Sequence, residues 1–381
     1  MSRDVAGRVV TPPATIGMMG GGQLGRYALM AARSMGYRTV VLEPDERAPA
    51  GAVADEHLVA AYDDAAALDR LASACAVVTT EFENPPASSL ERLARSTAVA
   101  PSAAAVAIAQ DRRSEKRVLA EAGLPVGPWG VVESADHRPD VGFPAILKTA
   151  HLGYDGKGQT AIASIDEIGD AWTALGSRAC VLERALALES EVSVVVARTA
   201  DRRTATYEVS ENHHVDGVLD LTVVPARVTA AVAERATELA RAVADALDYI
   251  GVLAVELFVV AGELYVNELA PRPHNSGHWT LDAARTSQFE QQIRAVCGIG
   301  LGETAMTAPA VAMVNLLGDL WHRGEPDWAR AFDEPRASVH LYGKAIARPG
   351  RKMGHLTITG RSADDVAAEA HQLRDAISRS R

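Results

Sequence analysis

The sequence predicts a protein of mixed α/β and α+β class, and three observations support this. Residues 14–100 alternate apolar, strand-like runs with helical segments, which is the pattern of a parallel sheet flanked by helices. Residues 229–269 contain an amphipathic helical pattern followed by an antiparallel hairpin. Residues 309–381 contain three short strand-like runs and a final helix. A chain of 381 residues organised in this way is expected to form about two to three domains.

The N-terminal third is expected to form a Rossmann-like domain. An apolar run at 14–20 ends in glycines and precedes a helical segment at 22–36. Further strand-like runs follow at 37–45 and 75–86, and prolines end the second of them. The segment VAPS at 99–102 marks a boundary.

The rest of the chain is expected to combine helices with antiparallel strands. A helix is predicted over 103–123 and a strongly amphipathic one over 229–248. The other expected elements are strands at 143–148, 179–184, 191–198 and 204–210, a helix near 165–176, a hairpin over 252–269, strands at 309–317, 337–343 and 355–359, and a helix at 363–378.

The composition is typical of a globular protein and argues against several kinds of partner. Hydrophobic residues make up 48% and charged residues 23% of the chain. The net charge of −11, without a basic block, disfavours nucleic acid or an anionic membrane as a partner. We see no signal peptide, and no run reaches the roughly 18 apolar residues of a membrane span. Cys75, Cys180 and Cys297 lie far apart in the sequence, so we expect no disulfide framework and a cytoplasmic location.

Lysine is rare in this chain, which makes its positions informative. Only five of the 38 basic residues are lysines, namely Lys116, Lys148, Lys157, Lys344 and Lys352. Lysine carries a compact ammonium where arginine presents a planar fork. A lysine kept in an arginine-rich background therefore marks a position that arginine cannot serve, unless the scatter is chance.

The segment GGGQLG at 20–25 follows the first strand and opens the first helix. Its Gly20, Gly22 and Gly25 match G-x-G-x-x-G, and Glu43 ends the next strand about 20 residues on, as in a dinucleotide fingerprint. Taken alone, this indicates an NAD-dependent dehydrogenase. Glycines let the backbone approach any anion at a helix N-terminus, so the phosphate of another ligand is an alternative.

A second glycine-rich segment, KTAHLGYDGKGQ at 148–159, follows a strand that ends in Lys148. Its glycines enclose Tyr154, Asp155 and Lys157 and do not match a Walker A loop. A glycine-rich loop that carries one lysine and follows another is typical of a lid over a polyphosphate. A flexible hairpin without a ligand is the alternative.

The predicted hairpin carries a pair of acids. With a three-residue loop at 261–263, Val260 pairs with Leu264, and Glu256 lies directly opposite Glu268 on one face. Two facing carboxylates repel each other unless a cation or a shared proton lies between them, and hard oxygen ligands favour Mg²⁺. The alternatives are a solvated polar face, or a register shifted by one residue that would separate the acids.

Three further polar segments are candidates for binding. Glu81 and Glu83 end a predicted parallel strand, where ligands commonly bind, although they could simply close the strand. In the tail, Lys344 and the segment RPGRKMGH, with Arg351, Lys352 and His355, form a basic cluster that suits a phosphate or, alternatively, a solvated turn. The segment HHVDG at 213–217 is more typical of a turn than of a metal site, because adjacent histidines on a strand point to opposite faces.

The segment NELAPRPHNSGHW at 267–279 directly follows the hairpin. It concentrates an acid, an arginine, two histidines and three turn-forming residues. By residue type alone it suits a metal site, an active-site loop or a polar surface connection.

Together, the lysine-bearing glycine loop and the paired-glutamate hairpin resemble the ATP-grasp superfamily. The segments GGGQLGR, EFEN, QDR, GYDGKGQ, NELAPRPHNSGHW and RPGRKMGH, in this order over about residues 14–360, resemble the N5-carboxyaminoimidazole ribonucleotide synthetases of purine biosynthesis. The resemblance implies an ATP-grasp fold with a Rossmann-like preATP-grasp domain at 1–105, an ATP-grasp domain at 106–305 that includes a lid at about 120–190, and a small α+β C-terminal domain at 306–381.

The resemblance also implies a reaction. In that family ATP and bicarbonate carboxylate the exocyclic amine of 5-aminoimidazole ribonucleotide, by way of carboxyphosphate. The products are N5-carboxyaminoimidazole ribonucleotide, ADP and phosphate, in the de novo synthesis of IMP. The implied cofactors are ATP and Mg²⁺, with Mn²⁺ as an alternative, and the implied form is a cytoplasmic homodimer.

The same resemblance assigns nucleotide contacts along the middle of the chain. Arg112 and Lys148 contact the ATP phosphates, 153–159 is the closing loop, and 183–186 is the hinge that recognises adenine. The metal ligands are Glu256 and Glu268; at Ala270 many ATP-grasp enzymes have an asparagine, so a third metal contact is left unassigned. The complete ATP set is Arg112, Lys148, Gly153, Tyr154, Asp155, Gly156, Lys157, Gly158, Gln159, Glu183, Arg184, Ala185, Leu186, Glu191, His214, Asn267 and Glu268.

The acceptor site is assigned in the same way. Arg272 and His274 would hold bicarbonate and then carboxyphosphate, and with Asp155 and Lys157 they form the implied catalytic set. The implied ribonucleotide contacts are Gly22, Gln23, Leu24, Glu83, Tyr154, Asn275, Ser276, Lys344 and Arg351. Lys116 receives no role, and neither does Lys352.

Three other functions agree with parts of the sequence. A formate-dependent glycinamide ribonucleotide transformylase has the same fold but another acyl donor and amine, and NELAPRPHNSGHW argues against it. A nucleotide-binding protein without turnover is disfavoured because both metal acids and the lid lysines are present. A dehydrogenase would leave every motif except GGGQLG unexplained.

Overall fold

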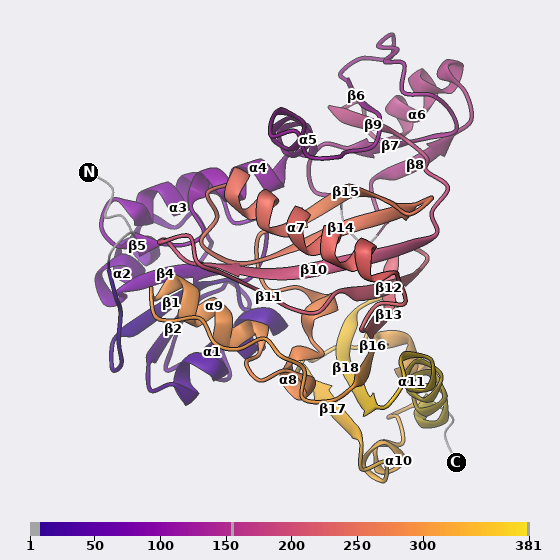
Figure 1. Ribbon diagram of the computed structural model, residues 1–381. Coiled ribbons are helices and arrows are strands. Elements are labelled where there is room, and N and C mark those ends of the chain that lie inside the picture. Colours follow the sequence, from indigo (N-terminus) through magenta and orange to yellow (C-terminus); the bar gives the residue numbers. More distant parts are fainter. Residues whose placement is uncertain (1–7, 154–155, 379–381) are drawn as a thin grey trace.

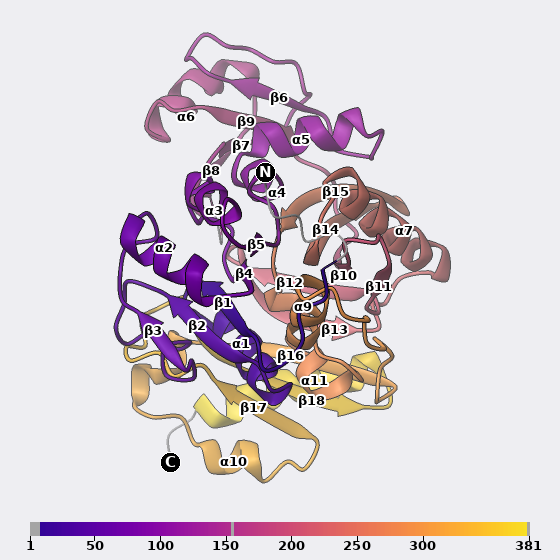
Figure 2. The ribbon, with the colours of Figure 1, turned by 90° about the vertical axis from the view of Figure 1, so that its left-hand side faces the viewer.

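The structure is a computed structural model that describes residues 8–153 and 156–378. Figure 1 shows three sheets: one in an N-terminal α/β unit, one in a small unit at the edge of the molecule, and a long central one. In the view of Figure 2, the small unit lies at the top and the C-terminal region at the bottom.

The N-terminal unit confirms the predicted Rossmann-like pattern. Its elements are β1 (Thr15–Met19), α1 (Gln23–Ser34), β2 (Arg38–Leu42), β3 (Glu56–Leu58), α2 (Ala65–Ala74), β4 (Val77–Thr80), α3 (Ala87–Ala94) and β5 (Ala98–Val99). The sheet is parallel throughout, in the order β3-β2-β1-β4-β5. Its central strands are apolar because both faces are covered, and Ile16 and Val77 are fully buried.

The single helix predicted over 103–123 is wrong. Two helices, α4 (Ala103–Gln110) and α5 (Arg112–Glu121), meet at Asp111, which has extended backbone angles of φ −125° and ψ 106°. The Asp111 carboxylate accepts a hydrogen bond from the backbone N–H of Arg113 at 2.9 Å. Asp111 is thus the N-cap of α5, and the absence of a glycine or proline between the two helices had concealed it.

The small unit, which we call the lid, is a four-stranded antiparallel sheet in the order β6-β9-β7-β8. It contains β6 (Trp129–Val132), β7 (Ala145–Thr149), β8 (Gln159–Ile162), a 3₁₀ turn η1 (Ile165–Glu167), α6 (Ile168–Ala174) and β9 (Cys180–Arg184). Val132, Leu147, Ile168 and Leu182 are buried in a core that belongs to the lid alone.

The central sheet has nine strands, in the order β15-β14-β10-β12-β13-β16-β18-β17, with β11 paired to β10. Its C-terminal strands therefore continue the sheet of the middle region. The elements are β10 (Ser190–Arg198), β11 (Thr204–Thr206), β12 (Ser210–Val215), β13 (Val218–Val224), α7 (Ala230–Ala246), β14 (Gly251–Val260), β15 (Glu263–Ala270), η2 (Asn275–Gly277), α8 (Thr280–Ala283), α9 (Gln288–Val296), β16 (Ala310–Leu317), η3 (Gly318–Arg323), α10 (Trp328–Phe332), β17 (Ala337–Leu341), β18 (Lys352–Gly360) and α11 (Ala363–Ser378).

Two local predictions in this sheet need correction. The strand predicted over 204–210 ends at Thr206, and β12 begins only at Ser210. The residues predicted as a turn, 213–217, begin in β12, with a register shift between His213 and His214, and only Asp216 and Gly217 have the positive φ angles of a turn.

The turn of the β14–β15 hairpin is one residue shorter than predicted. Ala261 and Gly262 form a two-residue turn with φ values of 50° and 77°. Val260 therefore pairs with Glu263, and the predicted pairing with Leu264 is wrong.

A β-bulge restores the predicted pairing farther along the hairpin. The register set by the turn, continued without interruption, would place Glu256 opposite Asn267. The pairing instead shifts between Glu256 and Leu257, so that Glu256 lies opposite Glu268. The two acids face each other as predicted, but for a different structural reason.

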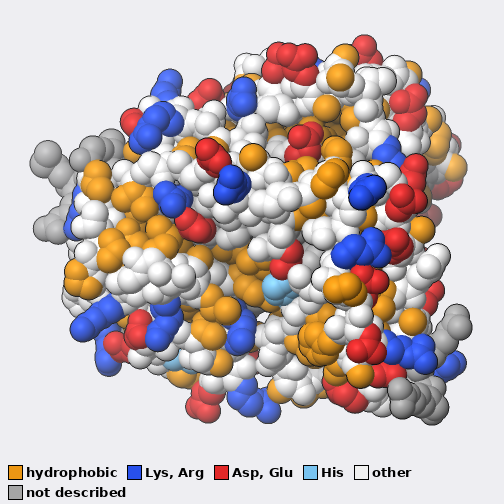
Figure 3. All heavy atoms as spheres, turned by 60° about the horizontal axis from the view of Figure 1, so that its bottom comes forward, with side chains coloured by type: hydrophobic (Ala, Val, Ile, Leu, Met, Phe, Trp, Pro, Cys, Tyr) orange, Lys and Arg blue, Asp and Glu red, His pale blue; other side chains and the backbone are white. Residues whose placement is uncertain are grey.

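The surface carries both signs of charge. On the face shown in Figure 3, acidic and basic side chains are interspersed among apolar ones. Within the described residues, no helix has the length and apolar character needed to span a membrane.

Candidate active site

A cleft of about 500 Å³ lies where the N-terminal unit, the lid and the central sheet meet. Residues from nearly the whole length of the chain form its walls. Of the predicted site residues, Gln23, Leu24, Glu83, Arg112, Lys148, Gly156, Lys157, Gln159, Glu191, His214, Glu256, Asn267, Glu268, Arg272, His274 and Asn275 line it. Gly153 lines a smaller adjoining cavity with Arg112 and Glu268.

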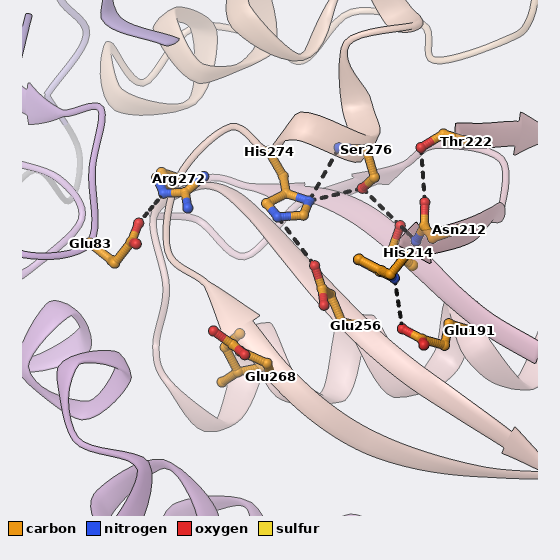
Figure 4. A network of polar contacts seen from close by, with 12 residues as sticks. Glu83, Glu191, Asn212, His214, Thr222, Glu256, Glu268, Arg272, His274 and Ser276 are labelled. Atoms are coloured by element: carbon orange, nitrogen blue, oxygen red, sulfur yellow. Dashed lines mark hydrogen bonds and ion pairs between the residues drawn. The ribbon is translucent and has the colours of Figure 1, made fainter. Parts of the chain in front are cut away.

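The facing acids each have a partner of their own. The Arg112 guanidinium lies 3.1 Å from Glu268 Oε2. His274 Nε2 lies 3.2 Å from Glu256 Oε1, a contact drawn in Figure 4. Burial and the nearby Glu268 carboxylate raise the pKa of Glu256. The two facing carboxylates therefore still favour a positive charge beside them, and their oxygen atoms are suitable ligands for Mg²⁺.

Arg272 joins the loop after β15 to the N-terminal unit. Its guanidinium forms a short ion pair with Glu83, drawn in Figure 4. Burial opposes ionisation of Glu83, but Arg272 outweighs this effect and lowers the Glu83 pKa. Burial and Arg272 lower the pKa of His274 well below its usual range. A fixed cation and a neutral imidazole thus lie side by side on the cleft wall.

His214 lines the same cleft as Glu256. Its Nδ1 atom lies 3.0 Å from Glu191 Oε2. Burial disfavours the imidazolium, yet the nearby Glu191 carboxylate outweighs burial and raises the pKa of His214. His213, its neighbour, instead contacts Glu211 at 2.8 Å, which agrees with the prediction that the two histidines point to opposite faces.

Lys116 and Lys148 share one carboxylate. Each ammonium nitrogen lies 3.3 Å from Glu183 Oε2, so the Glu183 side chain of the predicted hinge faces two lysines. Lys116 also donates to the carbonyl oxygens of Asn267 at 2.9 Å and Val266 at 3.4 Å. The Lys116 residue is 1% exposed. The only feature of the sequence that singled it out was the rarity of lysine in this chain.

The backbone N–H groups of the glycine-rich loop at 20–25 bind the protein's own carboxylates. The N–H groups of Gly22 and Gly25 donate to Glu81 at 2.8 and 2.9 Å, and that of Gly21 donates to Glu43 at 2.8 Å. An added Cβ at Gly22 would lie 2.6 Å from Glu81 Oε1. The anion expected at the N-terminus of α1 is therefore internal, which removes the basis for a dinucleotide phosphate there.

Several predicted residues do not line this cleft. Ser276, predicted to face the ribonucleotide, is fully buried behind His274 and does not line the cleft. Lys344 donates to the Lys352 carbonyl at 2.7 Å and Arg351 to the Ile346 carbonyl at 2.9 Å, whereas the Lys352 side chain, which had no predicted role, lines the cleft. The others outside the cleft lining are Gly22, Gly158, Glu183, Arg184, Ala185 and Leu186. Tyr154 and Asp155 lie outside the described residues.

His355 does not belong to the basic cluster in which the sequence placed it. Its ring is fully buried and stacks on His278 and His340, with centroids 4.5 Å away in each case. Asp282, His340 and His355 bring one potential ligand atom each within 4.8 Å of one another. The nearly parallel imidazole rings, however, cannot both aim their in-plane lone pairs at one ion, so we assign no metal there.

Comparisons with protein families agree with this architecture. A ribonucleotide synthetase preATP-grasp domain matches residues 13–110, an ATP-grasp domain matches 117–289, and a phosphoribosylaminoimidazole carboxylase C-terminal domain matches 311–369. The fold and the cleft thus define an ATP-grasp ligase.

Similar proteins of known function identify the family within the ATP-grasp ligases. The N5-carboxyaminoimidazole ribonucleotide synthase of Brucella melitensis is 46% identical to this chain over 91% of it and 96% of the relative. The Bacillus subtilis synthase is 40% identical over 94% of both chains. The chain belongs to the N5-carboxyaminoimidazole ribonucleotide synthase family.

Solved structures of this family have the same fold. An ADP complex of N5-carboxyaminoimidazole ribonucleotide synthetase superposes with a TM-score of 0.90 at 39% identity, over 98% of this chain and all (100%) of the other. The Aspergillus clavatus synthase in complex with ADP and 5-aminoimidazole ribonucleotide superposes with a TM-score of 0.85 at 29% identity, over 96% and 99% of the two chains.

Proposed function

We propose that this enzyme uses ATP and bicarbonate to carboxylate the exocyclic amine of 5-aminoimidazole ribonucleotide. The observation that carries the proposal is the single cleft in which the paired acids Glu256 and Glu268 lie beside the Arg272–Glu83 pair. One end has the chemistry of a nucleotide-metal site and the other has a cation suited to a small oxyanion. Family membership supports the choice of substrates and does not favour the formate-dependent alternative.

ATP is proposed to lie between the lid and β14–β15. Lys148 and Arg112 provide positive charge for its phosphates, and Glu191 and His214 line the same cleft. Ile146, Leu188 and Phe258 supply apolar surface for the base. Glu256 and Glu268 would hold Mg²⁺, or Mn²⁺, which supplies charge neutralisation at the phosphates.

The ribonucleotide is proposed to enter from the N-terminal unit. Gln23, Leu24 and Glu83 line the cleft from that unit, and Asn275 lines it from the segment after β15. Lys352 provides a positive charge at the same cleft for the 5′-phosphate, in place of the predicted Lys344 and Arg351. Arg272 and His274 would orient bicarbonate between the two substrates.

The chemistry requires positioning and exclusion of water. Bicarbonate oxygen attacks the γ-phosphorus of ATP and ADP leaves, giving carboxyphosphate; the amine then attacks its carbonyl carbon, phosphate leaves, and the nitrogen loses a proton. Arg272 stabilises negative charge in both steps. The lid, whose Lys157 lines the cleft, would shield carboxyphosphate from hydrolysis.

We also propose that the enzyme acts as a cytoplasmic homodimer and that its functional domains divide near residues 105 and 305, as the family resemblance implies. Analytical ultracentrifugation of the full chain would test the oligomeric state. A monomer at assay concentrations would contradict the proposed dimer.

A coupled assay of ADP release tests the proposed reaction. With Mg-ATP and bicarbonate present, ADP formation should depend on added 5-aminoimidazole ribonucleotide. ADP formation that is unchanged by this ribonucleotide, but stimulated by glycinamide ribonucleotide with formate, would overturn the acceptor assignment and leave the ATP-grasp class intact.

A further inference from the structure

A chain of buried hydrogen bonds leads from the interior of the central sheet to His274 (Figure 4). Thr222 Oγ1 lies 3.0 Å from Asn212 Oδ1, and Asn212 Nδ2 lies 2.8 Å from Ser193 Oγ. Ser193 Oγ lies 2.8 Å from Ser276 Oγ, which lies 2.9 Å from His274 Nδ1. The four residues behind His274 are at most 5% exposed, so the chain is shielded from bulk water.

This chain has a direction. The Asn212 amide nitrogen can only donate, so Ser193 Oγ accepts from it. The Ser193 hydroxyl in turn donates to Ser276 Oγ. The Ser276 hydroxyl, which already accepts from Ser193, is left to donate to His274 Nδ1. In this arrangement the donated protons all point toward the imidazole, and His274 Nδ1 accepts the last of them.

An independent donor points to the same atom. The backbone N–H of Ser276 donates to His274 Nδ1 at 3.3 Å. A backbone N–H cannot be turned round to accept, whereas a hydroxyl or an amide can. His274 Nδ1 is therefore an acceptor whichever way the Asn212 amide is oriented.

We propose that Ser193, Asn212 and Thr222 are positioning residues that act through Ser276 to hold His274 as the tautomer protonated on Nε2. The Nε2–H group then points into the cleft, where it lies 3.2 Å from Glu256 Oε1. His274 is in this arrangement a hydrogen-bond donor toward Glu256 or a bound oxyanion. It cannot accept the amine proton through Nε2, so the chain excludes it as the general base of the carboxylation.

This inference deepens the proposed function, because the role of the Nε2–H group rests on the acceptor site lying beside His274. The tautomer itself does not rest on the reaction. It can be measured in the free enzyme, so that failure of the inference and failure of the proposed function give different results.

Nitrogen-15 NMR of the histidine rings in the full-length enzyme, without ligands, is the direct test. The His274 signals are assigned by their loss in His274→Gln. In the native enzyme we expect Nδ1 to show the unprotonated, acceptor-type shift and Nε2 the protonated one. A protonated Nδ1 in the native enzyme would overturn the proposal.

Two matched variants separate the chain from general effects of losing a buried hydroxyl. Ser193→Ala cuts the chain, and we expect the Nδ1-protonated tautomer to become populated. Ser210 pairs with Ser193 in the neighbouring strand and accepts from the Trp279 indole at 3.2 Å, outside the chain. Ser210→Ala should leave the His274 signals unchanged; equal changes in the two variants, or none in Ser193→Ala, would overturn the proposal.

Kinetics provide a second readout. Ser193→Ala should lower kcat about tenfold while the KM for ATP stays within about twofold, because one hydrogen bond near the reacting groups is misdirected. Ser193→Thr, which keeps the hydroxyl, should restore the tautomer and most of kcat. An increase in the KM for ATP with unchanged kcat would contradict a role through His274.

Discussion

Glu256 lies directly opposite Glu268 because the β14–β15 ladder contains a bulge between Glu256 and Leu257. The carbonyl groups of Val266 and Asn267, on the bulged side of β15, both accept from the buried Lys116 ammonium. The same ammonium lies beside Glu183 in the lid strand β9. One buried cation thus ties the lid to the stretch of backbone that brings the two acids together.

Lys116→Met should therefore weaken nucleotide binding. Methionine fills a similar volume but cannot hold the bulge carbonyls, and hydrogen bonds to a charged group contribute about 1.5–3 kcal/mol each. We expect the Kd for ADP, measured by isothermal titration calorimetry, to rise about tenfold or more. Lys116→Arg is the matched control for charge and should rescue only partly, because a planar fork does not fit a site for a compact ammonium. An unchanged Kd in Lys116→Met would show that the bulge forms without the hydrogen bonds from Lys116.

Glu268→Ala should abolish ATP turnover while the fold survives. The side chain is a proposed metal ligand and the ion-pair partner of Arg112. Without this ligand, the metal ion proposed to neutralise the ATP phosphates would be bound less tightly. We therefore expect kcat to fall by about a hundredfold or more. ADP release measures the activity, and circular dichroism with thermal unfolding checks the fold. Full activity in a folded variant would contradict the metal assignment.

Glu81→Gln should destabilise the N-terminal unit. The Glu81 carboxylate accepts the N–H groups of Gly22 and Gly25, whereas a glutamine can accept both only through one oxygen and places an NH₂ group against the loop. We expect a loss of about 1–3 kcal/mol in the unfolding transition of this unit. Denaturant unfolding measures it, and Glu91→Gln, at an exposed position on α3, is the control. Equal midpoints for the two variants would count against an internal anion at α1.

Glu115→Gln should change how stability depends on pH. Burial and the Glu268 carboxylate raise the pKa of Glu115 to about 8, compared with about 4.3 in an unfolded chain. Between these values the folded protein keeps a proton that the unfolded chain has released, so the folded state binds more protons and stability falls as pH rises. Glutamine has no such proton, so Glu115→Gln should gain stability relative to the native enzyme as pH rises from about 5 to 8.

Thermal unfolding without nucleotide or divalent cation, repeated across this pH range, measures the effect. Glu121→Gln, at an exposed position at the end of the same helix, is the matched control and should follow the native curve. A constant difference in Tm between Glu115→Gln and the native enzyme at every pH would contradict the raised pKa.

Much of the architecture could be predicted because local patterns determine it. The parallel sheet followed from alternating strand and helix signals, and the hairpin from two apolar runs around a glycine-containing turn. Asp111 was missed because it lies in a polar run without glycine or proline, where an N-cap looks like one more helical residue. Lys116 could be singled out only by its rarity, since nothing nearby in the sequence shows that it reaches β15.

The motifs, their order and the chemistry of each residue were determined by the chain alone, because residue type and spacing are local properties. Which of those residues share one cleft was decided by the tertiary structure. Only long-range packing could place Arg272 against Glu83, turn Ser276 away from the cleft, and bring Lys352 to the wall. The pairing of Glu256 with Glu268 depends on both the local sequence and the tertiary structure. The turn residues set the register near the turn, and the bulge sets the register at the two acids. The carbonyls at this bulge accept hydrogen bonds from Lys116 on α5, because buried backbone groups that lose their partners in the ladder must find donors elsewhere in the fold.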